Sequence, residues 1–253
     1  MTGARAPRSD HYSYRVYADP GMAETFDGLR FSGPIGQLIA RTQEHVIAGF
    51  LDPLERRTVL DVGTGTGRAA IALARRGALV TGLDASAEML AVAHRRSREA
   101  GVDVTFLPGD AHHLAFDDRS FDAVICLRVL MHTPDWRQSL GELCRVARSR
   151  VVFDYPALWS VAALQAAFRR AASAFGAEVE AYRVFQARAI AATLESRGFR
   201  VTGEHRQFVL PIALHKRLNS ETATGRIERA LSRAGLTRVF GSPVTVVAER
   251  CAS

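Results

Sequence analysis

Three glycines and one carboxylate lie within one short segment of the chain, in a pattern suited to holding a polar ligand. Gly63, Gly65 and Gly67 come shortly after Asp61, with Val62 between Asp61 and the first glycine. Glycines permit positive φ angles and let a ligand approach the main chain with no Cβ in the way. Their G-x-G-x-G spacing differs from the G-x-G-x-x-G of dinucleotide-binding folds. A tight strand-to-helix turn that binds no ligand uses the same residues, so the glycines alone fit both interpretations.

Asp61 sharpens this interpretation because it lies inside an apolar stretch, two residues before the first glycine. A carboxylate in such a place is costly unless a polar group hydrogen-bonds to it. A pyrophosphate would be repelled by its charge, whereas a cationic amino-acid group would be attracted. The segment therefore favours a ligand with a cationic end.

Two further carboxylates follow the next two expected strands. Asp84 comes 21 residues after Gly63, where an acid at a strand tip can bind both hydroxyls of a ribose. NAD enzymes share this feature, and an aspartate there can also simply cap the next helix. Asp110 and Ala111 suit an adenine edge, since a carboxylate accepts from the exocyclic amino group and a backbone N–H donates to a ring nitrogen.

The elements that must position these residues alternate between strand and helix. From residue 57 to residue 153 this alternation predicts a doubly wound α/β domain, with a mostly parallel sheet and helices on both faces. Ser86 is expected to cap one helix, and Thr133 another that has Pro134 at its first position. The expected strands are 57–62, 78–83, 102–107, 121–127, 151–153, 199–210 (with a turn at Gly203) and 244–248. The expected helices are 35–50, 68–76, 87–101, 134–147, 157–176, 184–197 and 222–234.

Composition fits a globular protein, with 47% hydrophobic and 23% charged residues. The net charge of +7 comes wholly from residues 183–253, which hold 12 basic and 5 acidic side chains in no dense run. Only one of the 33 basic residues, Lys216, is a lysine, which indicates a general arginine bias. We therefore expect no nucleic-acid partner. The chain shows no secretory signal and no apolar run long enough to span a membrane. Its three cysteines have no metal-like spacing. These three features together predict a cytoplasmic protein.

Four motifs in order resemble the class I S-adenosylmethionine-dependent methyltransferases, especially the small-molecule group that includes the ubiquinone and menaquinone biosynthesis enzymes (methyltransferase type 11). They are VLDVGTGTGR at 59–68, VTGLDASAEML at 80–90, PGDAHHLAFDDRSFDAVIC at 108–126 and VLMHTPD at 129–135. The segment YADPGMAETFDGLRF at 17–31 is similar to the lid-like lead-in of that group. One departure is His112, where the group often has glutamate.

The resemblance implies a Rossmann-like sheet of seven strands, the last antiparallel, that binds S-adenosyl-L-methionine. Asp61 and the glycine turn would face its methionine end, Asp84 its ribose, and Asp110 with Ala111 its adenine. The expected cofactor-binding residues are Asp61, Gly63, Thr64, Gly65, Gly67, Asp84, Ala85, Met89, Asp110, Ala111, Leu127 and Arg128. We expect one domain over 1–253, with a helical lead-in over 1–54, the cofactor core over 55–155 and a substrate side over 156–253.

Methyl transfer to a small organic acceptor follows as the expected activity. His132 is the candidate general base, since imidazole titrates near neutral pH, although it could equally pack at a helix entry. Tyr17, Arg30 and Tyr155 are the candidate acceptor-binding residues, and no metal site is expected. Two alternatives remain at this point: an NAD(P)-dependent oxidoreductase, and a module that binds the cofactor without catalysis. The sequence leaves open the acceptor, the atom methylated and the oligomeric state.

Overall fold

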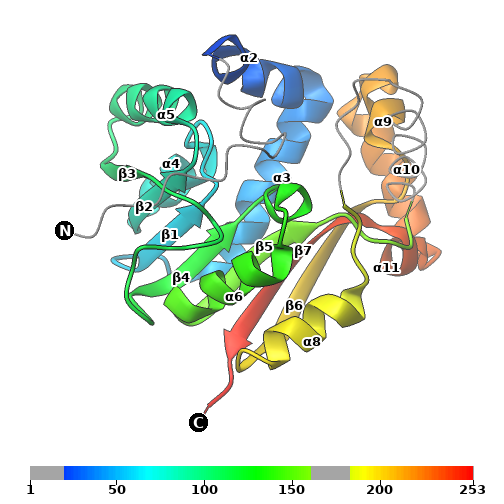
Figure 1. The fold of residues 1–253 in the computed structure, drawn as a ribbon. Coiled ribbons are helices and arrows are strands. Elements are labelled where there is room, and N and C mark those ends of the chain that lie inside the picture. The colour runs from blue at the N-terminus through cyan, green and yellow to red at the C-terminus, as the bar shows by residue number, and fades with distance from the viewer. Residues whose placement is uncertain (1–19, 161–182, 253) are drawn as a thin grey trace, which may run out of the picture.

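The computed structural model describes residues 20–160 and 183–252, and Figure 1 shows their arrangement. One sheet of seven strands forms the centre of the molecule. The strands are β1 (Thr58–Val62), β2 (Leu79–Asp84), β3 (Val104–Pro108), β4 (Phe121–Cys126), β5 (Ala147–Tyr155), β6 (Phe199–Phe208) and β7 (Ser242–Arg250).

The helices surround this sheet. They are α2 (Pro20–Phe31), α3 (Gly33–Leu51), α4 (Arg68–Ala74), α5 (Ala87–Glu99), α6 (Trp136–Val146), α8 (Ala187–Glu195), α9 (Ile212–Leu218), α10 (Glu221–Arg233) and α11 (Leu236–Phe240), with a short 3₁₀ turn η1 (Leu130–His132). No helix among the described residues has the length and apolarity needed to cross a membrane.

The strand order is β3-β2-β1-β4-β5-β7-β6. Strands β1 to β5 pair in parallel, and β7 runs antiparallel to both β5 and β6. This confirms the expected Rossmann-like sheet with an antiparallel last strand. The order reverses direction at β1, whose neighbours are β2 and β4, and ligands of open α/β sheets bind beside the carboxyl ends of the strands at such a point.

Two hydrophobic layers cover the sheet, one on each face. Alternate residues of one strand point to opposite faces, so Val59 packs with α3, α4 and α5 while Leu60 packs with α6 and α8. Both residues are fully buried. Apolar side chains on both faces explain why the central strands have nearly continuous hydrophobic sequences. Figure 1 shows α6 and α8 on one side of the sheet and α3 and α4 on the other.

Helix α2 was expected only as part of a helical lead-in. In the structure, ion pairs and a hydrogen bond hold it against the core. Glu24 pairs with Arg95 of α5 at 2.7 Å. Asp27 accepts a hydrogen bond of 3.0 Å from the Thr66 hydroxyl and also pairs with Arg96. These contacts place α2 over the carboxyl edge of the sheet.

Some sequence expectations are corrected by the structure. Helix α6 is capped by Asp135, whose carboxylate accepts from the backbone N–H groups of Arg137 and Gln138 at 3.1 Å, and not by Thr133, which ends η1. The stretch at Gly203 is not a turn but a bulge inside the continuous strand β6. The expected helix at 157–176 falls largely outside the described residues.

Candidate functional site

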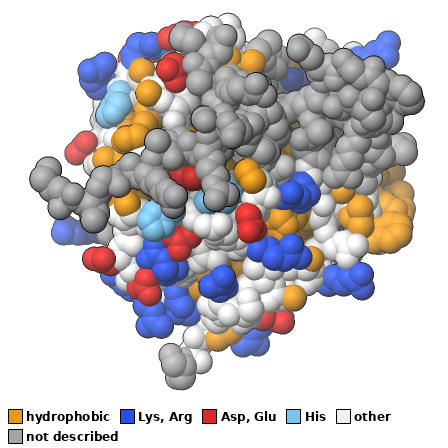
Figure 2. Space-filling view, in the orientation of Figure 1, with side chains coloured by type: hydrophobic (Ala, Val, Ile, Leu, Met, Phe, Trp, Pro, Cys, Tyr) orange, Lys and Arg blue, Asp and Glu red, His pale blue; other side chains and the backbone are white. Residues whose placement is uncertain are grey.

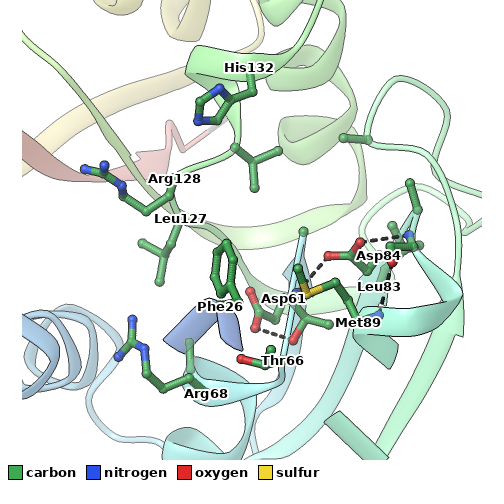
Figure 3. Close-up of a pocket in the computed structure, with 18 of the residues that line it drawn as sticks. Phe26, Asp61, Thr66, Arg68, Leu83, Asp84, Met89, Leu127, Arg128 and His132 are labelled. Atoms are coloured by element: carbon green, nitrogen blue, oxygen red, sulfur yellow. Dashed lines mark hydrogen bonds between the residues drawn. The ribbon is translucent and has the colours of Figure 1, made fainter. Parts of the chain in front are cut away.

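A cleft opens at the carboxyl edge of the sheet, beneath α2. Asp61 and Asp84 come from neighbouring strands, and Figure 3 shows Met89 beside Asp84, with Arg128 and His132 on another wall. Asp110 and Ala111, which follow β3, complete the row. Three carboxylates from the ends of three adjacent strands therefore line one cavity.

Asp61 is only 1% exposed. The Thr64 hydroxyl donates to its Oδ2 at 2.7 Å. Burial raises the pKa of Asp61 to about 6, against an ordinary value of 3.8, and the hydrogen bond from Thr64 only partly opposes this. A buried carboxylate in this state gains stability from a cation that enters the cleft.

Asp84 is held rigidly at the tip of β2. Its Oδ2 accepts from the Gly65 N–H at 2.7 Å and its Oδ1 from the Ser86 N–H at 2.9 Å. Burial raises its pKa, and these backbone donors lower it. Each carboxylate oxygen has two lone pairs, so Asp84 can hold the glycine turn and still accept from ligand hydroxyls.

Glycine is present at the three positions of the turn for different structural reasons. Gly63 has a φ of +73°, and a Cβ there would lie 2.2 Å from Val129 Cγ2. Gly65 has a φ of +55° and nothing within 4 Å of where its Cβ would be. Only Gly65 therefore leaves space for a ligand against the backbone.

Gly67 is the exception among the twelve expected cofactor residues. The other eleven line the cleft, whereas Gly67 is absent from the described lining. A Cβ on Gly67 would lie 3.0 Å from both Ala93 Cβ and Phe106 Cζ. Its role is to let α4 begin close against α5 and β3.

Gly65→Ala tests the open space above the turn. A methyl group would cost about 1 kcal/mol of backbone strain at this positive φ and would project into the cleft. We expect binding of S-adenosylhomocysteine to weaken at least tenfold. Gly101→Ala is the matched control, since Gly101 has a φ of +65° and equally open surroundings away from the cleft. Equal affinities of the two variants in calorimetry would contradict the assignment.

His112 departs from the resemblance but has a clear structural role. Its backbone N–H donates to Asp110 Oδ1 at 2.9 Å, and its Nδ1 lies 2.8 Å from the same oxygen. Its Nε2 accepts from the Asp135 N–H at 3.3 Å. The imidazole therefore joins the loop after β3 to the start of α6.

The candidate acceptor residues separate in the structure. Arg30 lines the cleft, with its guanidinium 4.5 Å from the centre of the Phe26 ring. Tyr155 is 2% exposed and packs its ring against Phe185 at 5.9 Å between centroids. This corrects its expected role, because Tyr155 points to the α6 face of the sheet and lies in the core. Tyr17 lies outside the described residues.

Several lining residues were missed by the sequence analysis. They are Phe26, Asp27, Phe31, Thr66, Arg68 and Ser86, with others from the same loops. Most come from α2 or touch it, as Arg68 does through the Phe31 ring at 4.5 Å. The resemblance of residues 17–31 to a lid-like lead-in was the signal that a helix there would cover the cleft. Among the described residues no group of histidine, cysteine and carboxylate side chains could hold a metal ion.

The fold and the cleft together define a class: a doubly wound α/β domain with a polar cleft at the carboxyl edge of its sheet. Residues 59–150 match the family model described as a methyltransferase domain. The predicted resemblance to the S-adenosylmethionine-dependent methyltransferases is thereby confirmed.

Two curated relatives and one solved structure are similar. The methyltransferase GfsG of Streptomyces halstedii is 35% identical over 147 residues, which cover 57% of this chain and 49% of the relative. The ubiquinone biosynthesis O-methyltransferase of Alkalilimnicola ehrlichii is 41% identical over 111 residues, covering 43% and 45%. The chain thus spans about half the length of these relatives. The magnesium protoporphyrin IX methyltransferase of Synechocystis PCC 6803, solved with bound S-adenosylhomocysteine, shares the fold with a TM-score of 0.68 at 19% identity, over 94% of this chain and 98% of that one.

Proposed function

We propose that this protein transfers the methyl group of S-adenosyl-L-methionine to a small organic molecule. The observation that carries the proposal is the convergence of Asp61, Asp84 and Asp110 on one cleft, beside the open backbone at Gly65. The family match and the relatives support the same activity.

The residues of the cleft fit this cofactor. Asp61 offers a buried carboxylate to its ammonium group, Asp84 can accept from its ribose hydroxyls, and Asp110 with the Ala111 N–H can recognise its adenine. Met89, which is 2% exposed, supplies an apolar surface for the nucleoside. When bound, the cofactor supplies a methyl group already activated by a sulfonium. The protein's main contribution is then to position donor and acceptor, which can lower a barrier by about 7–11 kcal/mol at best.

The raised pKa of Asp61, to about 6, predicts a pH-dependent affinity. Only the ionised carboxylate attracts the ammonium group, so affinity for S-adenosylhomocysteine should rise about tenfold from pH 5 to pH 7. In the protein without ligand, the raised pKa of Asp61 makes stability change in the opposite direction to affinity. The free energy of unfolding should fall as pH rises from the ordinary aspartate pKa of 3.8 to about 6, because ionising Asp61 is costlier in the folded state. Calorimetry at several pH values should show the affinity change in the wild type and not in Asp61→Asn. A flat wild-type profile would contradict the role of Asp61.

A thermal-shift titration separates this activity from an NAD(P)-dependent oxidoreductase. S-adenosylhomocysteine should raise the melting temperature and NADH should not, since a pyrophosphate at the glycine turn would meet the Asp61 carboxylate. The reverse result would overturn the proposal. A module that binds without catalysis would show tight binding but no transfer of labelled methyl groups to any acceptor.

Several sequence predictions remain part of this proposal. His132 is 7% exposed and lines the cleft, which keeps it a candidate general base. Arg30 remains a candidate acceptor-binding residue. A small-molecule partner, no nucleic-acid partner, one domain over 1–253 and a cytoplasmic location also remain predictions. On the face in Figure 2, Lys and Arg side chains are interspersed with Asp and Glu, which agrees with the absence of a dedicated basic patch there.

A further inference from the structure

A second cavity lies beside the cofactor cleft and shares Arg30, Phe31 and Arg128 with it. Its volume is about 210 Å³. One wall is the sheet face formed by β5, β7 and β6, and the opposite wall is formed by α3 and α9. The second cavity can therefore hold a molecule that reaches the cleft past Arg128.

Polar residues lie side by side on this sheet face. Asp154 of β5 is directly opposite Thr245 of β7, which is directly opposite His205 of β6. Such partners have Cβ atoms about 4.5–5.5 Å apart and share a face. Thr245 is two residues from Val247, which packs in the apolar layer beneath α3. The row interrupts a face that is otherwise hydrophobic.

The bulge in β6 is what turns His205 and Gln207 toward this cavity. Val201 pairs with Ala248, but Gly203 pairs with Val247, so one extra residue lies between them. Without the extra residue, His205 would point to the α6 face, because a shift of one residue exchanges the faces of a strand. Gly203 allows the bulge to pack closely, since a Cβ there would lie 3.0 Å from Val247 Cγ1.

Three buried polar atoms of this cavity have no hydrogen-bond partner among the described residues. They are Asp154 Oδ2, His205 Nε2 and Gln207 Nε2. Asp154 is only 2% exposed, and its other oxygen, Oδ1, accepts from the Arg128 N–H at 2.5 Å. An unsatisfied buried polar group costs about 1–3 kcal/mol. Three such groups around one cavity indicate a polar ligand or ordered water.

Three cationic side chains line the cavity around Asp154. Arg128 and Arg30 lie beside it and Lys216 of α9 lies across the cavity. Burial raises the pKa of Asp154, which these arginines only partly offset. Burial and the nearby His45 lower the pKa of His205 and favour its neutral form.

We propose that the second cavity binds the methyl acceptor and that the acceptor is a small hydroxyl-bearing molecule whose O–H donates to Asp154 Oδ2. This rests on the methyltransferase function proposed above. His205 and Gln207 hold further polar groups of the acceptor, and Ile39, Val46 and Ile212 contact its apolar part. In the transfer, the acceptor oxygen forms a bond to the methyl carbon, the carbon–sulfur bond breaks with its electron pair kept by sulfur, and the hydroxyl proton passes to Asp154 Oδ2.

Binding to the protein saturated with S-adenosylhomocysteine is the first test. Phenol should shift the methyl NMR signals of Val46 and Ile212, and toluene, which lacks the hydroxyl, should bind at least tenfold more weakly. Asp154→Asn keeps an oxygen for the Arg128 N–H but should weaken phenol binding at least tenfold. Glu249→Gln is the matched control, because it also turns a carboxylate into an amide on this sheet. Glu249 pairs with Arg150 and is not part of the second cavity, so phenol binding should not change. Equal binding of phenol and toluene, or no binding of either, would overturn the proposal.

Turnover is the second test, with labelled cofactor and the matched acceptors phenol, aniline, cyclohexanol and cyclohexylamine. Methyl transfer should occur to hydroxyl compounds, and Asp154→Asn should lower kcat at least 100-fold with an unchanged Kd for S-adenosylhomocysteine. Label on the amines alone, no label on any of the four, or full turnover by Asp154→Asn would overturn the inference. A 100-fold lower kcat in His132→Ala, with no such loss in Asp154→Asn, would also overturn the inference. Failure of the wild type to bind S-adenosylhomocysteine would instead contradict the proposed function itself.

Discussion

Asp84→Ala should weaken binding of S-adenosylhomocysteine by about 100-fold or more. The carboxylate orients the glycine turn through Gly65 and the next helix through Ser86, at 2.7 and 2.9 Å. We also expect it to accept from both ribose hydroxyls. Hydrogen bonds to a charged group contribute about 1.5–3 kcal/mol each, and two lost bonds to the ligand account for the expected factor. Isothermal titration calorimetry measures it directly.

Asp122→Ala is the matched control for this variant. Asp122 also accepts from a backbone N–H, that of Thr58 at 3.0 Å, and pairs with Arg148, but at the amino end of β4, far from the cleft. It should lower the free energy of unfolding and leave the affinity unchanged. If Asp84→Ala bound the ligand as well as this control does, the ribose assignment would be wrong.

Gly63→Ala should destabilise the protein by about 3 kcal/mol. A Cβ would lie 2.2 Å from Val129 Cγ2, and the φ of +73° is strained for any other residue. Overpacking typically costs about 1–3 kcal/mol and the left-handed conformation about 1–2 kcal/mol. Urea denaturation followed by circular dichroism gives the difference.

The double variant Gly63→Ala, Val129→Ala separates the two causes. It removes the clash and keeps the backbone strain, so part of the loss should be recovered relative to Gly63→Ala. Gly101→Ala, which has the strain alone, should cost only about 1 kcal/mol. No recovery in the double variant would show that the close contact with Val129 is not the reason for glycine at this position.

The parts of the fold that follow from local rules were predictable. Strict alternation of apolar strands and helices between 57 and 153 indicated the parallel sheet, and eleven of twelve expected cofactor residues line one cleft. Gly67 shows the limit of this reasoning. A glycine that lets helices pack closely and a glycine that admits a ligand look the same in sequence.

The acceptor side was less predictable because small shifts of register exchange the two faces of a strand. The expected strand 151–153 ended one residue before Asp154, and Tyr155 was chosen as a lining residue although it faces the core. A buried carboxylate at the end of an apolar strand was the same signal that identified Asp61. The bulge at Gly203, which aims His205 at the second cavity, depends on pairing between β6 and β7 and leaves no local trace beyond the glycine itself.

The most direct test of the account is a crystal structure of the protein with S-adenosylhomocysteine. The ribose should lie against Asp84, the adenine against Asp110 and Ala111, and the sulfur should face Leu127 and Arg128 at the border of the second cavity. A nucleoside bound anywhere else, or bound in the cleft with its sulfur turned away from Arg128, would contradict the site on which all the proposals depend.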